Sequence, residues 1–281
     1  MNKFIWISSY PKSGNTWVRY LIANYFYNKA KKFDAKVISS IKYFPIPSVI
    51  QKLVNKDELI KDPYNIAKYW IKSQEITNIN NGNIAFLKNH NALIRLNDCE
   101  LTNENLSLAA IYIVRDPRDV VVSYANYLGI TYDKTIEHLC SNDLRYNIEL
   151  DDTGFPRIEV IGSWKLNYIS WRDGIPQIPR IIIKYEDLTN NTYNTFYKIL
   201  NFLSKIMNFK IDVDQINIAL ENSNFKILKK TEKNIGFFEN EGKSIFFRNG
   251  KVGESKKKLN KKQILHIEKV FSDEMKILDY F

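Results

Sequence analysis

The fold is decided by residues 4–17, whose sequence is FIWISSYPKSGNTW. Residues 4–8 form a short apolar run rich in β-branched and aromatic side chains, which predicts a strand. A turn of Ser, Pro and Gly residues follows, and from Thr16 onward the apolar residues recur at helical spacing. A strand, a loop and a helix in this order are typical of the opening of a nucleotide-binding α/β unit.

The rest of the chain continues this alternation. Further strands are predicted at residues 84–87, 108–114 and 180–184, and the run at 108–114 is nearly continuous and apolar, as a buried parallel strand should be. Asp116 followed by Pro117 predicts an N-cap and the first turn of a helix that runs to about Tyr127. We therefore expect the α/β class, with a mostly parallel central sheet flanked by helices, similar to P-loop NTPases. The remaining helices are predicted at residues 64–76, 132–147, 159–172, 189–206, 212–222 and 260–278.

Length and composition favour one globular domain. The chain has 281 residues, of which 44% are hydrophobic, and this is enough to bury one sizeable core. A single domain covering residues 1–281 is therefore expected. The formal net charge of +10 is compatible with a lysine-rich surface and equally with attraction to a polyanion, such as nucleic acid or a phosphorylated nucleotide.

The cysteines and histidines indicate a protein without a disulfide framework or a metal site. Cys99 and Cys140 have no paired spacing, and the three histidines are scattered along the chain, which fits a reducing compartment. The apolar run near the N-terminus is too short for a signal peptide, and no stretch approaches the roughly 20 apolar residues of a membrane helix. We expect a cytoplasmic protein without a membrane span.

The turn at residues 12–16 has the properties of an anion-binding loop. Backbone N–H groups at a helix N-terminus attract an anion, and Gly14 lets the backbone approach it closely. Lys12 adds a full positive charge, and short polar side chains surround it. The turn is not a Walker A loop, in which the lysine follows the second glycine, because here the lysine precedes the only glycine.

Polar residues also follow two of the other predicted strands. Arg115 comes directly after the strand at 108–114, and Ser123 lies about two helical turns further on, so both can face one ligand. A guanidinium can grip phosphate oxygens through two parallel hydrogen bonds. His90 follows the strand at 84–87, and a histidine with a pKa near 6.5 can accept a hydroxyl proton around neutrality.

Together these motifs resemble those of the cytosolic-type sulfotransferase family. The sequence YPKSGNTW at residues 10–17 resembles the family's 5′-phosphosulfate loop, and RDPRDVVVS at 115–123 resembles its 3′-phosphate motif. KNH at 88–90 is similar to its Lys-Thr-His segment, and RNGKVG at 248–253 to its late Arg-Lys-Gly-x-x-Gly element. The chain departs from the family's pattern at Asn15, Asn89, Asn91, Ala92, Asn249 and Ser255.

The resemblance implies an enzyme that moves a sulfuryl group from 3′-phosphoadenosine 5′-phosphosulfate (PAPS) to a hydroxyl or amine acceptor, leaving 3′-phosphoadenosine 5′-phosphate (PAP). It implies that His90 is the general base, that Lys12 neutralises charge on the leaving oxygen, that Lys88 assists, and that no metal takes part. The acceptor would be a small molecule or a carbohydrate, and no nucleic-acid partner is expected. The implied nucleotide-binding residues are Lys12, Ser13, Gly14, Asn15, Thr16, Trp17, Arg115, Ser123, Tyr185, Ser223, Phe225, Arg248, Asn249 and Gly250.

Two other functions remain open at this point. A P-loop kinase or NTPase would explain the opening strand, loop and helix, but it requires a Walker A lysine and an acidic strand end that binds Mg²⁺. A non-catalytic binder of nucleic acid or another polyanion would explain the positive charge, but it leaves the order of the motifs unexplained. The acceptor and the oligomeric state cannot be read from the sequence.

Overall fold

The computed structural model describes residues 3–78, 84–141, 143, 146–151, 153–237, 239–240, 245–248 and 250–281. The chain divides into two compact units. The first consists of Met1–Tyr10, Ile41–Ile113 and Ser141–Ile182, and the second of Pro11–Ser40, Val114–Cys140 and Ile183–Phe281. The prediction of a single domain over residues 1–281 stays a prediction.

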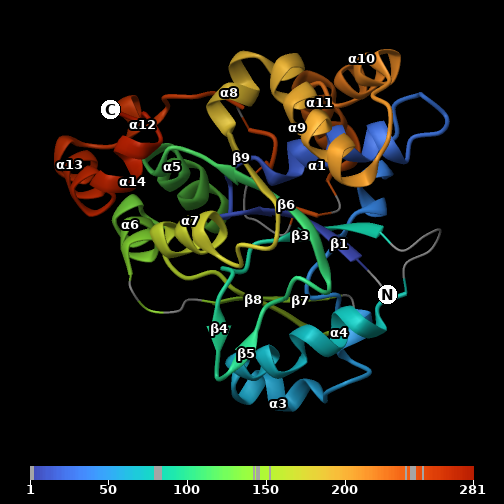
Figure 1. Ribbon diagram of the computed structural model, residues 1–281. Coiled ribbons are helices and arrows are strands. Elements are labelled where there is room, and N and C mark those ends of the chain that lie inside the picture. The colour runs from blue at the N-terminus through green and yellow to red at the C-terminus, as the bar shows by residue number, and fades with distance from the viewer. Residues whose placement is uncertain are drawn as a thin grey trace. The chain divides into compact units, whose positions relative to one another are not determined.

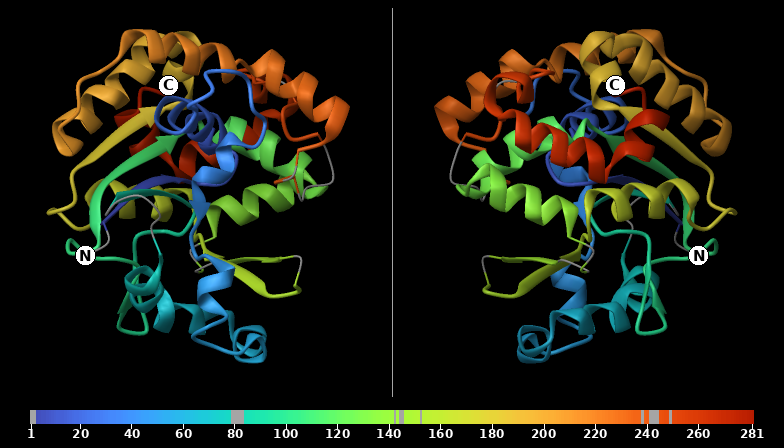
Figure 2. Two further views of the ribbon diagram at one scale, coloured as in Figure 1. Left: turned by 90° about the vertical axis from the view of Figure 1, so that its right-hand side faces the viewer. Right: turned by 90° about the vertical axis from the view of Figure 1, so that its left-hand side faces the viewer.

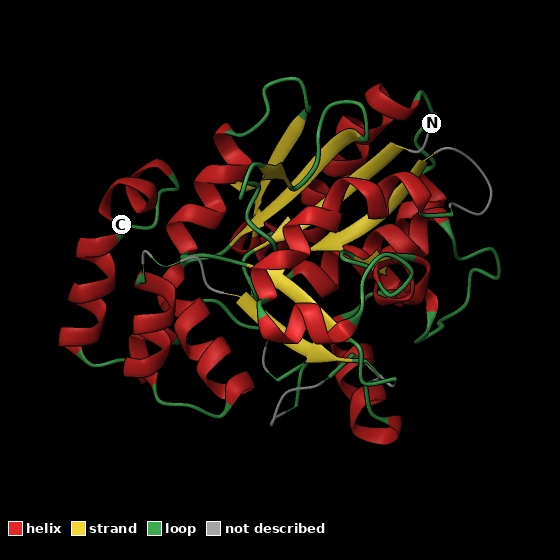
Figure 3. Ribbon diagram, turned by 90° about the horizontal axis from the view of Figure 1, so that it is seen from below, coloured by secondary structure: helices red, strands yellow, loops and turns green. Residues whose placement is uncertain are grey.

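The central sheet lies in the first unit, apart from the last residues of β6 and β9. Its strands are hydrogen-bonded in the order β2-β3-β1-β6-β9. Figure 3 shows the strands of the sheet in yellow, side by side. Central strand β1 pairs in parallel with β3 and β6; Ser8 lies opposite Asn89 and Ser9 opposite Ile113, so these three strands end at the same edge. The strands are β1 (Lys3–Ser9), β2 (Lys42–Tyr43), β3 (Ile84–Asn89), β6 (Ser107–Val114) and β9 (Arg180–Lys184).

The first unit also contains a β-hairpin and several short helices. The hairpin pairs β7 (Tyr146–Leu150) with β8 (Pro156–Val160) in antiparallel fashion. Between these strands the Asp151 carboxylate accepts hydrogen bonds from the backbone N–H groups of Thr153 and Phe155, which closes the turn. The other elements are α2 (Pro47–Ile50), α3 (Lys56–Lys61), the 3₁₀ helix η2 (Pro63–Tyr69), α4 (Trp70–Ile76), β4 (Arg95–Leu96), β5 (Cys99–Glu100) and α7 (Trp164–Asp173).

Trp6 on β1 is at the centre of the first unit's core. Its side chain is fully buried, with its ring 5.1 Å from that of Phe44 and 6.1 Å from that of Trp171. Its indole Nε1–H donates to Ser107 Oγ at 2.8 Å, and this hydroxyl also contacts Thr102 Oγ1 at 2.7 Å. The indole therefore combines apolar packing with a satisfied polar atom, as buried tryptophans usually do.

The second unit is helical. Its helices α8 to α11 form one group (Figure 2), and the C-terminal helices lie beside α5 and α6 (Figure 1). Among the described residues, no helix combines the length and the apolar character that crossing a membrane requires. The elements are α1 (Asn15–Phe26), the 3₁₀ helix η1 (Val37–Ser40), α5 (Pro117–Leu128), α6 (Tyr132–Cys140), α8 (Tyr185–Asn190), α9 (Thr192–Met207), α10 (Val213–Asn222), α11 (Phe225–Ile235), α12 (Ser255–Lys258), α13 (Lys261–Val270) and α14 (Ser272–Ile277).

The predicted fold class is confirmed, whereas several predicted helix bounds are wrong. The helix expected at 132–147 ends at Cys140, and the one expected at 159–172 begins at Trp164. Both errors have one cause, the hairpin of β7 and β8, because pairing between strands overrides the local helical spacing. The helix expected at 260–278 is interrupted at Phe271, and the first half of the one expected at 64–76 is 3₁₀.

Replacing Trp6 by alanine should lower the free energy of unfolding by about 3–5 kcal/mol, since it removes a buried ring and leaves a cavity. Trp6→Phe is the matched control and should cost less, because it keeps most of the ring volume and leaves Ser107 its contact with Thr102. Urea denaturation monitored by circular dichroism measures both effects. Equal losses in the two variants would contradict the assignment of Trp6 to the core.

Candidate functional site

The turn after β1 has a backbone suited to an anion. Lys12 and Gly14 both have positive φ angles, 64° and 103°, and Gly14 is the N-cap of α1. Backbone conformations of this kind, placed before a helix N-terminus, form concavities lined by N–H groups. A side chain at Gly14 would be strained, because its Cβ would lie 2.5 Å from Cδ2 of Tyr185. Asn15 and Thr16 are the first residues of α1.

Two side chains of the turn, those of Ser13 and Lys12, have properties that suit a bound anion. Ser13 is 0% exposed, and its hydroxyl has no hydrogen-bond partner among the described residues. A buried hydroxyl without a partner is costly, so its presence fits a site that a ligand oxygen would complete. The Lys12 ammonium lies over the rings of Tyr127 and Phe246, at 4.2 and 3.7 Å from their centres. These cation–π contacts hold a positive charge at the turn.

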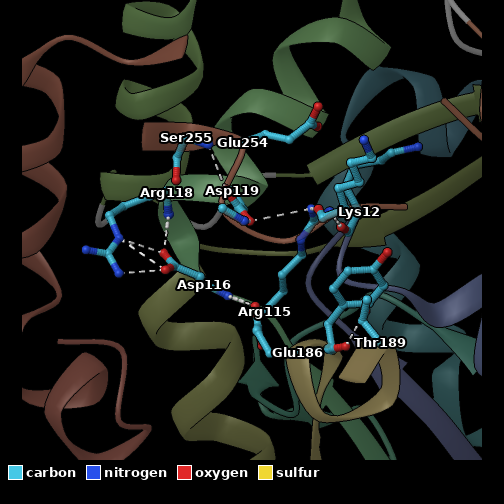
Figure 4. A network of polar contacts seen from close by, with 12 residues as sticks. Lys12, Arg115, Asp116, Arg118, Asp119, Glu186, Thr189, Glu254 and Ser255 are labelled. Atoms are coloured by element: carbon cyan, nitrogen blue, oxygen red, sulfur yellow. Dashed lines mark hydrogen bonds and ion pairs between the residues drawn. The ribbon is translucent and has the colours of Figure 1, made fainter. Parts of the chain in front are cut away.

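Arg115 connects three segments of the second unit (Figure 4). Its guanidinium donates to the backbone oxygen of Lys12 at 3.2 Å and to that of Lys251 at 3.1 Å. It also lies 4.5 Å from the centre of the Tyr185 ring, and its Nη2 is 3.8 Å from Oδ2 of Asp119. Arg115 is only 6% exposed, so these contacts fix its charge beside the turn.

The neighbours of Arg115 are held by a separate ion-pair network (Figure 4). Asp116 caps α5 by accepting from the backbone N–H of Arg118 at 2.9 Å, and it pairs with the Arg118 guanidinium at 2.6 Å. The Asp116 backbone N–H donates to Glu186 at 3.1 Å, and Tyr280 Oη donates to the same carboxylate at 3.0 Å. Burial raises the pKa of Glu186, although these hydrogen bonds oppose the shift.

Ser123 lies on the same face of α5 as Asp119 and Tyr127. It is half-buried and stands four residues after Asp119 and four residues before Tyr127. Residues four apart share one face of a helix. Asp119 contacts Arg115 and Tyr127 contacts Lys12, so Ser123 lies on the helix face that carries these two neighbours of the cations.

Trp17, Tyr185 and Phe225 are the aromatic residues among those predicted to bind the nucleotide. Trp17 Nε1 donates to the backbone oxygen of Ser223 at 3.0 Å, and the Trp17 ring lies 6.2 Å from that of Tyr185. Phe225 begins α11 and packs against Gly250, where an added Cβ would lie 2.8 Å from the Phe225 ring. The rings of Trp17 and Phe225 are half-buried, and such rings offer flat faces on which a base can stack.

Arg248 has a partner within its own segment, since its guanidinium forms an ion pair with Glu254. Asn249 lies outside the described residues. The structure thus brings together, through a continuous series of contacts, twelve of the predicted nucleotide-binding residues around Lys12 and Arg115. They are Lys12, Ser13, Gly14, Asn15, Thr16, Trp17, Arg115, Ser123, Tyr185, Ser223, Phe225 and Gly250.

Lys88 and His90 belong to the first unit, at the end of β3. His90 Nδ1 lies 2.7 Å from the backbone oxygen of Ser9, which can only accept a hydrogen bond. Nδ1 therefore carries the proton, and Nε2 presents a lone pair. The pairing of Ser8 with Asn89 explains the contact, because each next residue extends past the same edge of the sheet.

A compact charged cluster surrounds this histidine. Lys88 Nζ forms a buried ion pair with Glu159 at 3.4 Å and lies 4.5 Å from the centre of the Tyr43 ring, which Arg157 also covers at 4.2 Å. Burial and the Lys88 ammonium lower the pKa of His90 to about 3. Burial alone would raise the pKa of Glu159, but the Lys88 ammonium and the Arg157 guanidinium outweigh it and lower that pKa. With a pKa of about 3, the His90 imidazole is neutral around pH 7.

Buried asparagines fix the path of the histidine loop. Asn91 Oδ1 accepts from the backbone N–H of Val160 at 2.7 Å, and the Asn91 backbone oxygen accepts from Trp171 Nε1 at 2.9 Å. Asn167 Nδ2 donates to the backbone oxygen of His90 at 2.9 Å. Asn91 is one of the departures from the family pattern, and its side-chain amide ties the loop to β8 through the hydrogen bond with Val160.

Several side chains of this site were not singled out in the sequence. Tyr127 and Phe246 beside Lys12, and Arg157 and Glu159 beside Lys88, have no distinctive local pattern. Asp119 did carry a signal, since it stands four residues after Arg115 and begins a helix.

Comparisons with known proteins agree with this geometry. The family model described as the sulfotransferase domain matches residues 2–279. Sulfotransferase 2A6 of Rattus norvegicus is 29% identical over 59% of this chain, a match that spans 56% of the rat enzyme. The amine sulfotransferase of Oryctolagus cuniculus is 23% identical over 97% of this chain and 80% of its own length.

Solved structures share the fold. Retinol dehydratase in complex with retinol and PAP superposes with a TM-score of 0.62 at 18% identity, over 98% of this chain and 82% of that one. Mouse sulfotransferase SULT7A1 complexed with PAP gives a TM-score of 0.59 at 20% identity, over 98% and 85% of the two chains. With a family model that covers nearly its whole length, the chain belongs to the sulfotransferase family.

Proposed function

We propose that this chain transfers the sulfuryl group of PAPS to a hydroxyl or amine of a small-molecule or carbohydrate acceptor, with release of PAP. The observation that carries the proposal is that the Arg115 guanidinium donates hydrogen bonds to the backbone oxygens of Lys12 and Lys251. These two bonds bring three segments of the chain together around the cationic side chains of Lys12 and Arg115. A nucleotide with phosphate groups at both its 5′ and 3′ positions suits such a site. Membership of the sulfotransferase family supports the same donor.

The residues have distinct roles in the proposed nucleotide site. Lys12, Ser13 and the N–H groups at the start of α1 bind the 5′-phosphosulfate, and the unpartnered Ser13 hydroxyl supports this role. Arg115, Ser123 and Arg248 bind the 3′-phosphate. Trp17 and Phe225 pack against the adenine.

The proposed reaction is an in-line displacement at sulfur. The acceptor oxygen or nitrogen forms a bond to sulfur while the bond between sulfur and the bridging oxygen breaks, and its electron pair stays on the 5′-phosphate of PAP. His90 Nε2 takes the acceptor proton. Lys12, with assistance from Lys88, neutralises the charge that grows on the bridging oxygen, as in phosphoryl transfer.

The tautomer of His90 supports its role as the base, because the hydrogen bond to the Ser9 backbone oxygen leaves Nε2 unprotonated and able to accept a proton. In the sequence, Ser9 stands only three residues before Lys12.

The acceptor and the cellular location belong to the same proposal. Among the relatives are an amine sulfotransferase and a 3-beta-hydroxysteroid sulfotransferase, which supports small-molecule acceptors that carry amines or hydroxyls. Cys99 and Cys140 are both free thiols, which supports a cytoplasmic location. An acceptor screen with labelled PAPS, followed by mass spectrometry of the products, would identify the acceptor.

Nucleotide binding separates the proposed function from the two alternatives. Calorimetric titration should show saturable binding of PAP without Mg²⁺ and weaker binding of ATP with Mg²⁺. Preference for ATP and Mg²⁺ would favour a kinase or NTPase. Salt-sensitive binding of nucleic acid without a saturable nucleotide site would favour a polyanion binder.

His90→Ala should lower kcat by about a hundredfold or more, the usual contribution of a general base, while the Kd for PAP stays unchanged. The measurement is steady-state sulfation of the best acceptor found in the screen. His266→Ala, which removes an exposed histidine on α13, is the control and should be silent. Near-normal turnover by His90→Ala would show that another group takes the proton.

The lowered pKa of His90 also predicts a dependence of stability on pH. Its pKa is about 3 in the folded chain and about 6.5 in an unfolded one, so between these values the unfolded state binds an extra proton. The contribution of His90 is complete above about pH 6.5 and declines as the pH falls toward about 3. Urea midpoints at about pH 7.5 and about pH 5 should therefore differ less in His90→Gln than in the wild type, and identical differences would refute the shift.

A further inference from the structure

Two buried carboxylates hold the segment formed by residues 245–255. Asp119 at the start of α5 accepts from the backbone N–H of Gly253 at 2.6 Å and from that of Ser255 at 2.9 Å. Glu232 on α11 accepts from the backbone N–H groups of Phe246 and Phe247 at 2.6 and 2.7 Å. The two acidic side chains thus hold the segment near both of its ends.

These hydrogen bonds are of the strong kind. Asp119 is 1% exposed and Glu232 is 8% exposed, so each carboxylate has given up most of its hydration and relies on its protein donors. Hydrogen bonds to an ionised acceptor are shorter and about twice as strong as neutral ones. An amide in place of either carboxylate would turn an NH₂ group toward a backbone donor and lose one of the two bonds.

Arg248 lies between these two attachment points, and the proposed function places it at the 3′-phosphate. Arg115 adds a third attachment by donating to the Lys251 backbone oxygen, and Phe247 packs 6.0 Å from the Phe225 ring. Arg248 and residues 250–252 are therefore bordered by fixed points on either side. Fixing both ends lowers the entropy that is lost when the segment orders around a ligand.

We propose that Asp119 and Glu232 are positioning residues that set the affinity for the 3′-phosphate through this segment. The inference rests on the proposed function. Neither carboxylate binds the nucleotide itself, since each is occupied by backbone N–H groups. Their effect is accordingly specific to ligands that carry a 3′-phosphate, and adenosine 5′-monophosphate (AMP), which lacks it, does not benefit.

The test compares the Kd values of PAP and AMP, measured by calorimetry for Asp119→Asn, Glu232→Gln and the wild type. Asp212→Asn is the matched control, because it makes the same charge change in the same unit and leaves an N-cap residue on α10. In the first two variants PAP binding should weaken about tenfold or more, the loss expected when a hydrogen bond to a charged group is removed, and AMP binding by less than about threefold. The control should leave both Kd values unchanged.

Other outcomes overturn the inference. Equal weakening of PAP and AMP would show that the carboxylates only stabilise the fold, and unchanged PAP binding would show that the segment does not need them. If Asp119→Asn does not fold, as judged by circular dichroism, Glu232→Gln carries the test with the same outcomes. A wild-type protein that binds PAP no better than AMP would instead overturn the proposed function, and this inference with it.

Discussion

The arrangement of the second unit depends on one buried guanidinium. Arg115 donates to the backbone of both Lys12 and Lys251 and stacks on Tyr185, so a single charged group links the turn before α1, the end of β6 and the C-terminal segment. A buried charge requires compensating partners, and here the backbone oxygens of Lys12 and Lys251 and the nearby Asp119 carboxylate contact the two Nη atoms. Because this buried cation takes its hydrogen-bond acceptors from different segments, the positions of these segments depend on one another.

Three acidic side chains of the second unit accept hydrogen bonds from backbone N–H groups. Asp119 accepts from Gly253 and Ser255, Glu232 accepts from Phe246 and Phe247, and Asp116 caps α5. Asp119 thus fixes Gly253 and Ser255 next to Arg115, which it also contacts.

In the first unit, a neutral histidine lies close to a charged lysine. Glu159 compensates Lys88, and the Ser9 backbone oxygen selects the tautomer of His90. The asparagines at 91 and 167 then fix the loop through side-chain hydrogen bonds to the backbone. Ser9, Glu159 and Asn167 come from three other elements, so the properties of the imidazole belong to the packed unit and not to the loop alone.

The sequence alone determined the strand, turn and helix start within residues 4–17 and the cap of α5, through local periodicity and the backbone freedom of Gly14. The grouping of Lys12 with Arg115 was implied by the family resemblance, and the common edge at which the parallel strands end gives its physical reason. Only the tertiary structure decided the hairpin of β7 and β8, the tautomer and pKa of His90, and the attachment of residues 245–255 to Asp119 and Glu232. Partners such as Asp119 and Gly253 are far apart in the chain, and burial sets the strength of their contact, so no local pattern carries that information.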